Sequence, residues 1–247
     1  MKRPRLLTHW TGKDICTARA DLNTQARTQY LERLMSLLEH GFWMTLPQEH
    51  LVGLAEDETQ PRRLSYQAPM TCFTELRLST ARMHQQRYGL LGVVVDRDFV
   101  LARWGAPVHY VRSNRDDPLV ANAVMLMAWL QKQKESKIEN ADTIMTNMNF
   151  LVGFMKGMSD TEHEDFRYLD EQEWRIVHSH AQEQRERLLP TNKDMPKYLI
   201  PFVREDVQML VVPDADFRSK VYECEIFTDW VGNSPIPVLT TEEIEHF

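Results

Sequence analysis

The side chains of this chain best suited to chemistry are gathered in residues 168–177, which read Tyr-Leu-Asp-Glu-Gln-Glu-Trp-Arg-Ile-Val. If this run is a strand, alternate side chains point to opposite faces. One face would then pack inward with the apolar set Tyr168, Trp174 and Ile176. The other would line a surface or a cleft with the charged set Glu171, Glu173 and Arg175. Two close carboxylates beside an arginine can be tuned to different protonation states, so this run is our first candidate site.

The acidic pair also has a structural interpretation. Glu171 and Glu173 could be solvated strand residues, with one of them paired to Arg175. A cross-strand or neighbouring ion pair of that kind can fix the register of a strand. The residue types alone are compatible with both interpretations.

Two ring side chains far from this run are further candidates. His9 lies in the apolar run 6–11, which we expect to be a strand ending at Gly12. A histidine there can be a satisfied core residue or a catalytic one. Tyr88 stands before Gly89 and the β-branched strand candidate 89–95. It can be a packing aromatic at a turn or a platform on which a ligand ring stacks.

Metal and thiol chemistry have weaker support. His178 and His180 form an H-x-H pair, which can supply two metal ligands. No third ligand stands at a usual spacing, so we expect no metal site. Cys16, Cys72 and Cys224 are too far apart for a paired zinc or redox motif, and an odd, low count is typical of a reducing cytoplasm. No phosphate-binding loop or nucleophile elbow occurs.

Composition restricts the class of protein. With 247 residues, 43% of them hydrophobic and 26% charged, the chain has the make-up of a globular protein and the length of one large domain. A formal net charge of -7 argues against non-specific nucleic-acid binding. No signal peptide and no apolar run of membrane-spanning length stand out. We therefore expect a cytoplasmic protein that does not bind membranes.

Hydrophobic periodicity predicts an alternation of strands and helices that is not strict. Expected strands cover residues 6–11, 69–74, 89–95, 107–111, 149–155 and 168–177, and residues 197–203 and 207–212 look like two paired strands. Expected helices cover residues 25–40, 76–87, 96–104, 116–138, 182–189, 214–221 and 240–247. This order predicts one α+β domain over residues 1–247, with a mixed, mostly antiparallel sheet flanked by helices.

Five segments, in order along the chain, carry a family resemblance. They are the strand 7–11 with His9, residues 72–79 of the form C-F-x-[DE]-x-x-L-S, residues 88–95 with Tyr88-Gly89, the P-V-x-Y strand 107–111, and residues 168–175 of the form Y-x-[DE]-E-x-E-W-R. Together they resemble the AbiGi-type family of abortive-infection proteins over roughly residues 6–212. The resemblance implies bacterial phage defence, as a protein encoded beside a toxin and labelled antitoxin.

A more distant resemblance is to the folds of mono-ADP-ribosyltransferases. Those enzymes carry a histidine or arginine on an early strand, an aromatic residue on a middle strand and a glutamate on a late one. The positions in this order are His9, Tyr88, and Glu171 or Glu173. The chain departs from that pattern because Tyr88 precedes its strand instead of lying within it.

Two hypotheses from different classes follow. The first is a binding protein that regulates a cognate toxin or another protein partner. Its contact surface would be acidic, at residues 160–165 and 242–245, and rich in methionine, at Met125, Met127, Met145, Met148, Met155 and Met158. Such methionines can equally be core residues.

The second hypothesis is glycosyl transfer from NAD, either to an acceptor or to water. No cofactor is certain, and NAD would be the substrate. Glu173 would stabilise positive charge on the ribose, and Glu171 would orient the acceptor. The remaining site residues would be His9 on a ribose hydroxyl, Tyr88 on the nicotinamide, and Arg175. The two hypotheses differ in whether His9 and Glu173 must converge in one cleft.

Overall fold

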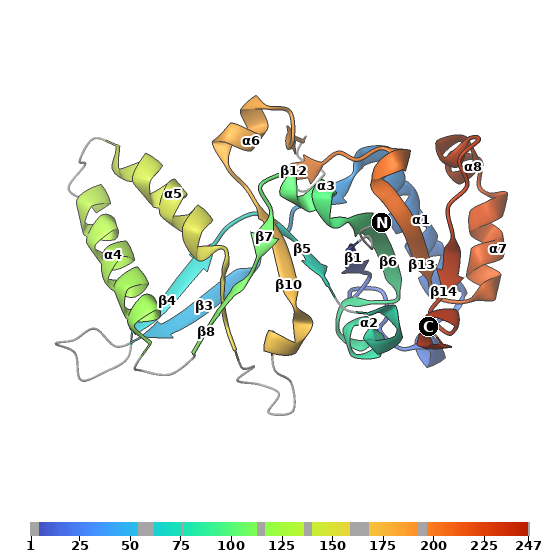
Figure 1. The fold of residues 1–247 in the computed structure, drawn as a ribbon, viewed down its shortest axis with the longest axis horizontal. Coiled ribbons are helices and arrows are strands. Elements are labelled where there is room, and N and C mark those ends of the chain that lie inside the picture. Colours follow the sequence, from blue (N-terminus) through green and yellow to red (C-terminus); the bar gives the residue numbers. More distant parts are fainter. Residues whose placement is uncertain are drawn as a thin grey trace.

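A seven-stranded sheet organises the chain (Figure 1). The computed structural model describes residues 5–53, 62–75, 77–112, 117–135, 140–158, 168–191 and 197–246. The strand order is β14-β13-β6-β1-β5-β10-β7, and all neighbours are antiparallel except β13 and β14. Their bounds are β1 Leu6–Thr11, β5 Met70–Thr74, β6 Leu91–Asp96, β7 Ala106–Pro107, β10 Glu173–Val177, β13 Val207–Val212 and β14 Val238–Thr240. This confirms the expected α+β class with a mixed, mostly antiparallel sheet.

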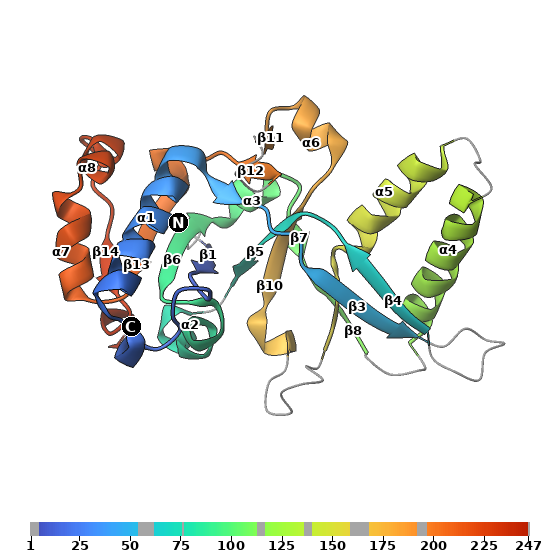
Figure 2. The same ribbon diagram turned by 180° about the vertical axis from the view of Figure 1, so that it is seen from behind.

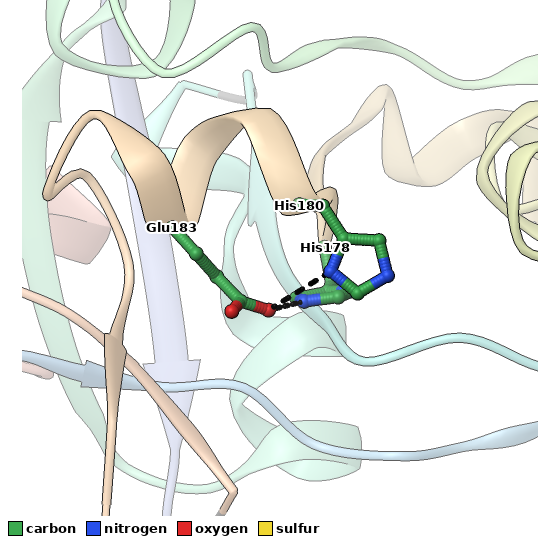
Figure 3. Close-up of side chains that lie close together, drawn as sticks. All are labelled: His178, His180 and Glu183. Carbon is green, nitrogen blue, oxygen red and sulfur yellow. Dashed lines mark hydrogen bonds and ion pairs between the residues drawn. The ribbon is translucent and has the colours of Figure 1, made fainter. Parts of the chain in front are cut away.

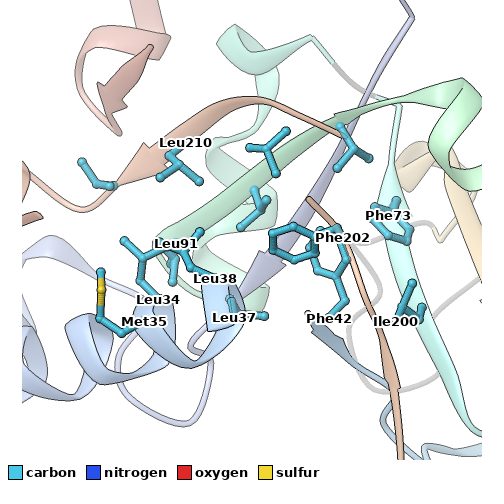
Figure 4. Packing of buried hydrophobic residues seen from close by; sticks show 14 of the residues in the cluster. Leu34, Met35, Leu37, Leu38, Phe42, Phe73, Leu91, Ile200, Phe202 and Leu210 are labelled. Carbon is cyan, nitrogen blue, oxygen red and sulfur yellow. The ribbon is translucent and has the colours of Figure 1, made fainter. Parts of the chain in front are cut away.

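The first face of this sheet carries the main hydrophobic core. It is covered by α1 (Thr24–His40), α3 (Arg97–Leu101), α7 (Ala215–Glu223) and α8 (Glu225–Val231). Figure 4 shows the apolar side of α1, with Leu34, Leu37 and Leu38, packed against Leu91 and Leu210 of the sheet. Helix α1 begins where the Asn23 side chain accepts a hydrogen bond from the Ala26 amide, and ends at Gly41, whose φ is +98°.

The second face is covered in two portions. Near β6 and β13 it packs against α2 (Arg82–Tyr88) and the 3-10 turn Glu243–His246, around a cluster of Trp10, Ala81, Val94, Val211 and Ile244. Near β5 and β10 it faces a second group of elements at one end of the molecule. These are the hairpin of β3 (Gln48–Gly53) and β4 (Arg62–Gln67), the parallel pair of β8 (His109–Val111) and β9 (Met155–Gly157), α4 (Pro118–Glu135) and α5 (Ala141–Val152).

This end group has a small core of its own, formed by Leu51, Tyr66, Val111, Val120, Ala123, Val124, Val152 and Met155. The Tyr66 hydroxyl ties the hairpin to β9 by donating to the Met155 carbonyl oxygen at 2.8 Å. Figure 2 shows the hairpin, α4 and α5 at the end of the molecule opposite α7 and α8. That the chain forms a single domain over residues 1–247 stays a prediction.

A separate three-stranded sheet joins β11 (Leu189–Pro190), β12 (Tyr198–Ile200) and β2 (Phe42–Trp43). The expected pairing of residues 197–203 with 207–212 is therefore wrong. Strand β13 instead joins the main sheet, because Pro201 and the 3-10 turn Arg204–Asp206 separate it from β12. Between β10 and β11 lies α6 (His180–Gln184).

Several other expected elements differ from those observed. Residues 149–155 are not a strand, because α5 continues to Val152 and only Met155–Gly157 is extended. The expected helix 76–87 is a 3-10 turn, Leu78–Thr80, followed by α2, and the expected strand 107–111 divides into β7 and β8. The terminal segment forms the short 3-10 turn Glu243–His246 instead of an α-helix. The acidic stretch 160–165 lies outside the described residues.

Of residues 168–177, only Glu173–Val177 are extended. Tyr168–Glu171 form a 3-10 turn, and Gln172 between the two has a φ of +45°. Tyr168 therefore does not share the inward face of Trp174 and Ile176. Among the described residues, no helix is long and apolar enough to span a bilayer.

Candidate functional site

A cleft of about 890 Å³ opens between the second face of the main sheet and the end group. His9, Tyr88, Glu171 and Glu173 all line it, although they come from three separate segments of the chain. The fold therefore brings together four of the five site residues of the transferase hypothesis, whereas the fifth, Arg175, is fully buried and is not among the residues that line the cleft. Their catalytic roles stay predictions.

Glu173 lies at the start of β10 and is nearly buried, with Arg175 beside it on the same face. Arg175 has no exposed surface, and its Nε donates to Glu173 Oε1 at 2.7 Å. Its other nitrogens donate to the Gly153 carbonyl oxygen at 2.7 Å and to Glu49 Oε1 at 3.1 Å. Burial alone would raise the pKa of Glu173, but Arg175 and Lys156 together hold this pKa well below its usual range. Glu173 therefore holds its negative charge to a lower pH than an ordinary glutamate does.

Lys156 of β9 is the residue that joins the two glutamates. Its Nζ donates to Glu171 Oε2 and to Glu173 Oε2, both at 2.7 Å, and lies 4.3 Å from the centre of the Tyr168 ring. Burial would lower the pKa of this amine, but Glu173 and Glu171 raise it well above its usual range. Lys156 is therefore a fixed cation and not a nucleophile. A single lysine between Met155 and Gly157 gave no signal in the sequence.

Glu171 has a different environment. The Tyr88 hydroxyl donates to its Oε1, and Arg87 Nε lies 3.9 Å from the same oxygen. Burial raises the pKa of Glu171, and repulsion from Glu173 adds to this, so that Lys156 compensates only in part. The structural interpretation described both glutamates as solvated. This is wrong, because both are at most 5% exposed. One site therefore holds an ionised carboxylate and a second that gains a proton more readily.

His9 fills a gap between two strands. Strands β1 and β5 pair only at Thr8 and Thr74, and beyond that point His9 Nδ1 lies 2.9 Å from the Cys72 carbonyl oxygen. A carbonyl can only accept, so Nδ1 carries the proton and Nε2 keeps its lone pair. Burial lowers the pKa of His9 from 6.5 to about 4, although the bond to Cys72 opposes this shift. His9 is therefore a neutral imidazole at physiological pH.

Tyr88 is placed in the cleft by a close approach of two glycines. Gly89 has a φ of +109°, and a Cβ there would lie 2.3 Å from the Thr11 carbonyl oxygen and 2.5 Å from the Gly12 carbonyl carbon. Only glycine fits both the conformation and the space. The Tyr88 hydroxyl is engaged with Glu171, so its contribution to the site is a hydrogen bond as well as a ring.

Comparison with known proteins identifies the family. The family model described as "Putative abortive phage resistance protein AbiGi, antitoxin" matches residues 54–213, well over half of the chain. This chain belongs to the AbiGi family. The family resemblance seen in the sequence is thereby confirmed, and with it a role in abortive phage resistance of the antitoxin class. A search of curated proteins and a search of solved structures found no match.

The matched region of this AbiGi protein holds about half of the cleft residues, including Tyr88, Lys156, Glu171 and Glu173, whereas His9 precedes it. One further group within the matched region, the hydroxyl of Tyr110, is not apparent from the sequence as part of the site. The Tyr110 hydroxyl accepts a hydrogen bond from the Glu173 amide at 2.9 Å. The sequence does not indicate this role, because the contact forms only where β8 and β9 pack against β10.

The thiol of Cys72 is not a nucleophile in this AbiGi cleft. Burial raises its pKa well above the usual range, and the charge of Glu173 raises it further. His84, which could have served as its base, lies with Nε2 3.4 Å from Thr74 Oγ1, and burial lowers its pKa to about 4. The cysteine–histidine chemistry is therefore not supported.

The rim of the AbiGi cleft is basic and aromatic. Besides the buried Lys156, the cations that line the cleft are Lys13, Arg33, Arg87 and Arg112, and its partly exposed aromatic side chains include Trp43 and Tyr168. Arg33 lies over the Trp43 ring at 5.1 Å and donates to Asp14 at 2.7 Å and to Thr11 Oγ1 at 3.1 Å. Guanidinium groups and aromatic faces are the groups with which proteins bind phosphates and nucleobases.

Proposed function

We propose that this AbiGi protein binds NAD, or a dinucleotide much like it, in the cleft and cleaves the nicotinamide–ribose bond. The observation that carries the proposal is the convergence of His9, Tyr88, Glu171 and Glu173 in a single cleft. The ribosyl group would pass to water or to an acceptor hydroxyl. Abortive infection would then act through loss of NAD or through modification of a target.

The cleft has the size and lining that such a ligand needs. Its volume of about 890 Å³ falls in the upper part of the range of small-molecule sites. The basic and aromatic rim offers partners for a pyrophosphate and for a base. The acidic pair and His9 also line the cleft, and there a ribose with its hydroxyl groups would be bound.

Cleavage of the bond between nicotinamide and ribose sends the electron pair to nicotinamide and leaves positive charge on the ribose. A carboxylate close to the ribose stabilises that charge. Water then adds its oxygen to the ribose carbon, and a base accepts the released proton. Two carboxylates with different proton affinities suit these two tasks.

Of the two, Glu171 is better suited to act as the base. Its raised pKa makes it a stronger base than an ordinary glutamate, and Tyr88 and Lys156 hold it in position. The negative charge of Glu173 is balanced by direct contacts with Arg175 and Lys156. The ionised cluster of these three residues, and not Glu173 alone, would therefore act on the ribose. The neutral His9 would accept one hydrogen bond from a ribose hydroxyl at Nε2.

Binding is tested by titrating the purified protein with NAD and following tryptophan fluorescence, because Trp10 and Trp43 line the cleft. We expect saturable quenching in the wild type. The variant Arg33→Met should weaken NAD binding at least tenfold, because it removes a rim cation. The control Glu223→Gln, on the exposed side of α7, should bind like the wild type. No quenching by NAD, or equal affinity in Arg33→Met, would overturn the proposal.

A second candidate function is binding of a protein partner. The helical pair α4 and α5 exposes the apolar side chains Leu119, Met125, Leu126, Trp129, Ile144 and Leu151, of which Trp129 is 54% exposed. Exposed apolar patches on this scale are typical of interaction surfaces. Antitoxins act on cognate toxins, and this face is the best supported contact surface for one.

A further inference from the structure

A cluster of three metal-ligating side chains lies at the end of β10, outside the cleft. His178 and His180 follow β10 directly, and Glu183 comes from the first turn of α6. Figure 3 shows the three side chains pointing toward one another. The third ligand, which spacing along the sequence did not indicate, is supplied by the turn from strand into helix.

The three candidate ligand atoms are close together. His178 Nε2 is hydrogen-bonded to Glu183 Oε1, and His180 Nδ1 lies 3.7 Å from the same oxygen. One ligand atom from each residue can be chosen so that all lie within 4.8 Å of one another. Tetrahedral zinc with bonds of about 2.0–2.1 Å places its ligand atoms about 3.4 Å apart. Small side-chain rotations would therefore complete the geometry.

The backbone and the neighbouring side chains hold two of the ligands in place. Ser179 caps α6 by accepting from the Gln182 amide at 3.3 Å, and this sets the direction of the first helical turn. The His178 ring stacks on Tyr198 of β12 at 4.1 Å between centroids. The Tyr198 side chain also hydrogen-bonds the Glu183 carboxylate. Such contacts behind the ligands are a regular feature of metal sites.

We propose that His178, His180 and Glu183 form a site for a divalent transition metal, with zinc as the best match. Two imidazoles and one carboxylate are ligands that zinc prefers, and among the described residues this is the one such group. The His180 side chain is 69% exposed, so a fourth position is open to solvent. A bound metal would join the β10–α6 turn and brace it against β12.

This site is independent of the proposed NAD chemistry. Glu173 and His178 are five residues apart along an extended strand, which places them about 16 Å from each other. The two proposals therefore stand or fail separately. The metal site can be tested without any assay of turnover.

The test is a titration of the full chain with Zn²⁺ in competition with a chromophoric chelator. We expect one zinc per chain in the wild type. His180→Ala and Glu183→Gln should each weaken binding at least tenfold, while the control His40→Ala, with an exposed ring at the end of α1, should bind like the wild type. Circular dichroism verifies that each variant is folded.

The proposal is overturned if the wild type does not compete with the chelator for zinc. It is also overturned if His180→Ala and Glu183→Gln both bind zinc as tightly as the wild type. A loss in His180→Ala alone would reduce the site to the two histidines and would contradict the role of Glu183.

Discussion

Two glutamates that stand two residues apart differ in proton affinity because they meet different partners. Glu173 faces Arg175 and Lys156 at 2.7 Å each, so its charge is compensated twice. Glu171 shares Lys156 and otherwise has the neutral hydroxyl of Tyr88 as its closest partner. Division of labour between paired carboxylates follows from such differences in environment. The distinction is a property of the tertiary fold.

Arg175 supports this cluster, and removing it should destabilise the protein. In Arg175→Met the buried Glu173 loses its closest cation, and breaking a buried pair in this way costs about 3–5 kcal/mol of unfolding free energy. Urea denaturation measures this cost. The control Arg82→Met, at an exposed position of α2, should change the unfolding free energy by less than about 0.5 kcal/mol. A change of similar size in both variants would contradict the role of Arg175.

His9 and His84 make stability depend on pH. Burial lowers the pKa of each from 6.5 to about 4, so the unfolded chain binds more protons than the folded one between these values. Their contribution to stability is complete above pH 6.5 and is lost as the pH falls through about 4. Each histidine should add up to about 1.4 kcal/mol per pH unit to the slope.

Urea denaturation between pH 4 and pH 7 measures this slope. His84→Gln should reduce the slope by the contribution of nearly one proton, about 1.4 kcal/mol per pH unit, because glutamine does not titrate. An unaltered slope in His84→Gln would show that His84 is not buried in its neutral form.

The sequence predicted part of this site at the level of residues. The pattern of residues 168–177 indicated correctly that Glu173 and Arg175 would share a face away from the core. It placed Tyr168 wrongly, because the turn at Gln172 was not recognisable. Lys156 was not predicted at all, since its pairing with the glutamates arises only when the end group packs against β10.

At the scale of elements, those with a strong local signal were predicted well. Helix α1 has a regular apolar face and a glycine stop, and β6 is a β-branched run, so each was expected within a few residues of its observed bounds. The β3–β4 hairpin was not expected, and α5 was mistaken in part for a strand. Short apolar runs such as residues 150–152 do not distinguish a helix end from a strand.

The turn between α2 and β6 is the element that positions Tyr88. In Gly89→Ala the new methyl group would collide with the backbone at Thr11, and the positive φ of +109° would also be strained. We expect the unfolding free energy to fall by more than about 2 kcal/mol. Urea denaturation provides the measurement.

The matched control is Gly232→Ala. Gly232 also has a positive φ, +51°, but its nearest neighbour for a Cβ is the Asp229 carbonyl oxygen at 3.8 Å. This substitution should cost only about 1 kcal/mol of unfolding free energy, from backbone strain. If both variants lost the same unfolding free energy, the backbone at Gly12 would not lie as close to Gly89 as the structure shows.

At the scale of the whole molecule, the cleft lies where two groups of elements meet. The main sheet contributes His9 and Glu173, and the end group contributes Lys156. The same end group presents the exposed apolar face of α4 and α5. A partner that binds this face could therefore influence the cleft, which would connect the two candidate functions.

Trp129→Gln tests whether this face binds a partner. Trp129 is exposed, so the unfolding free energy should change by less than about 0.5 kcal/mol. Affinity for a cognate toxin, the partner proposed for this face, should fall at least tenfold, because tryptophans dominate protein interfaces. Calorimetric titration with that protein gives the affinity. Leu101→Gln, at an exposed site of α3, is the control, and equal loss in both variants would exclude a specific role of α4.

The most direct test of the central claim is the release of nicotinamide from NAD by the purified protein, measured by chromatography. We expect release by the wild type and a decrease of about 100-fold or more in Glu171→Gln, which keeps the shape of the side chain and removes the base. NAD binding by this variant should stay within a few-fold of the wild type. Absence of release by well-folded wild-type protein, or full release by Glu171→Gln, would contradict the assignment of the cleft.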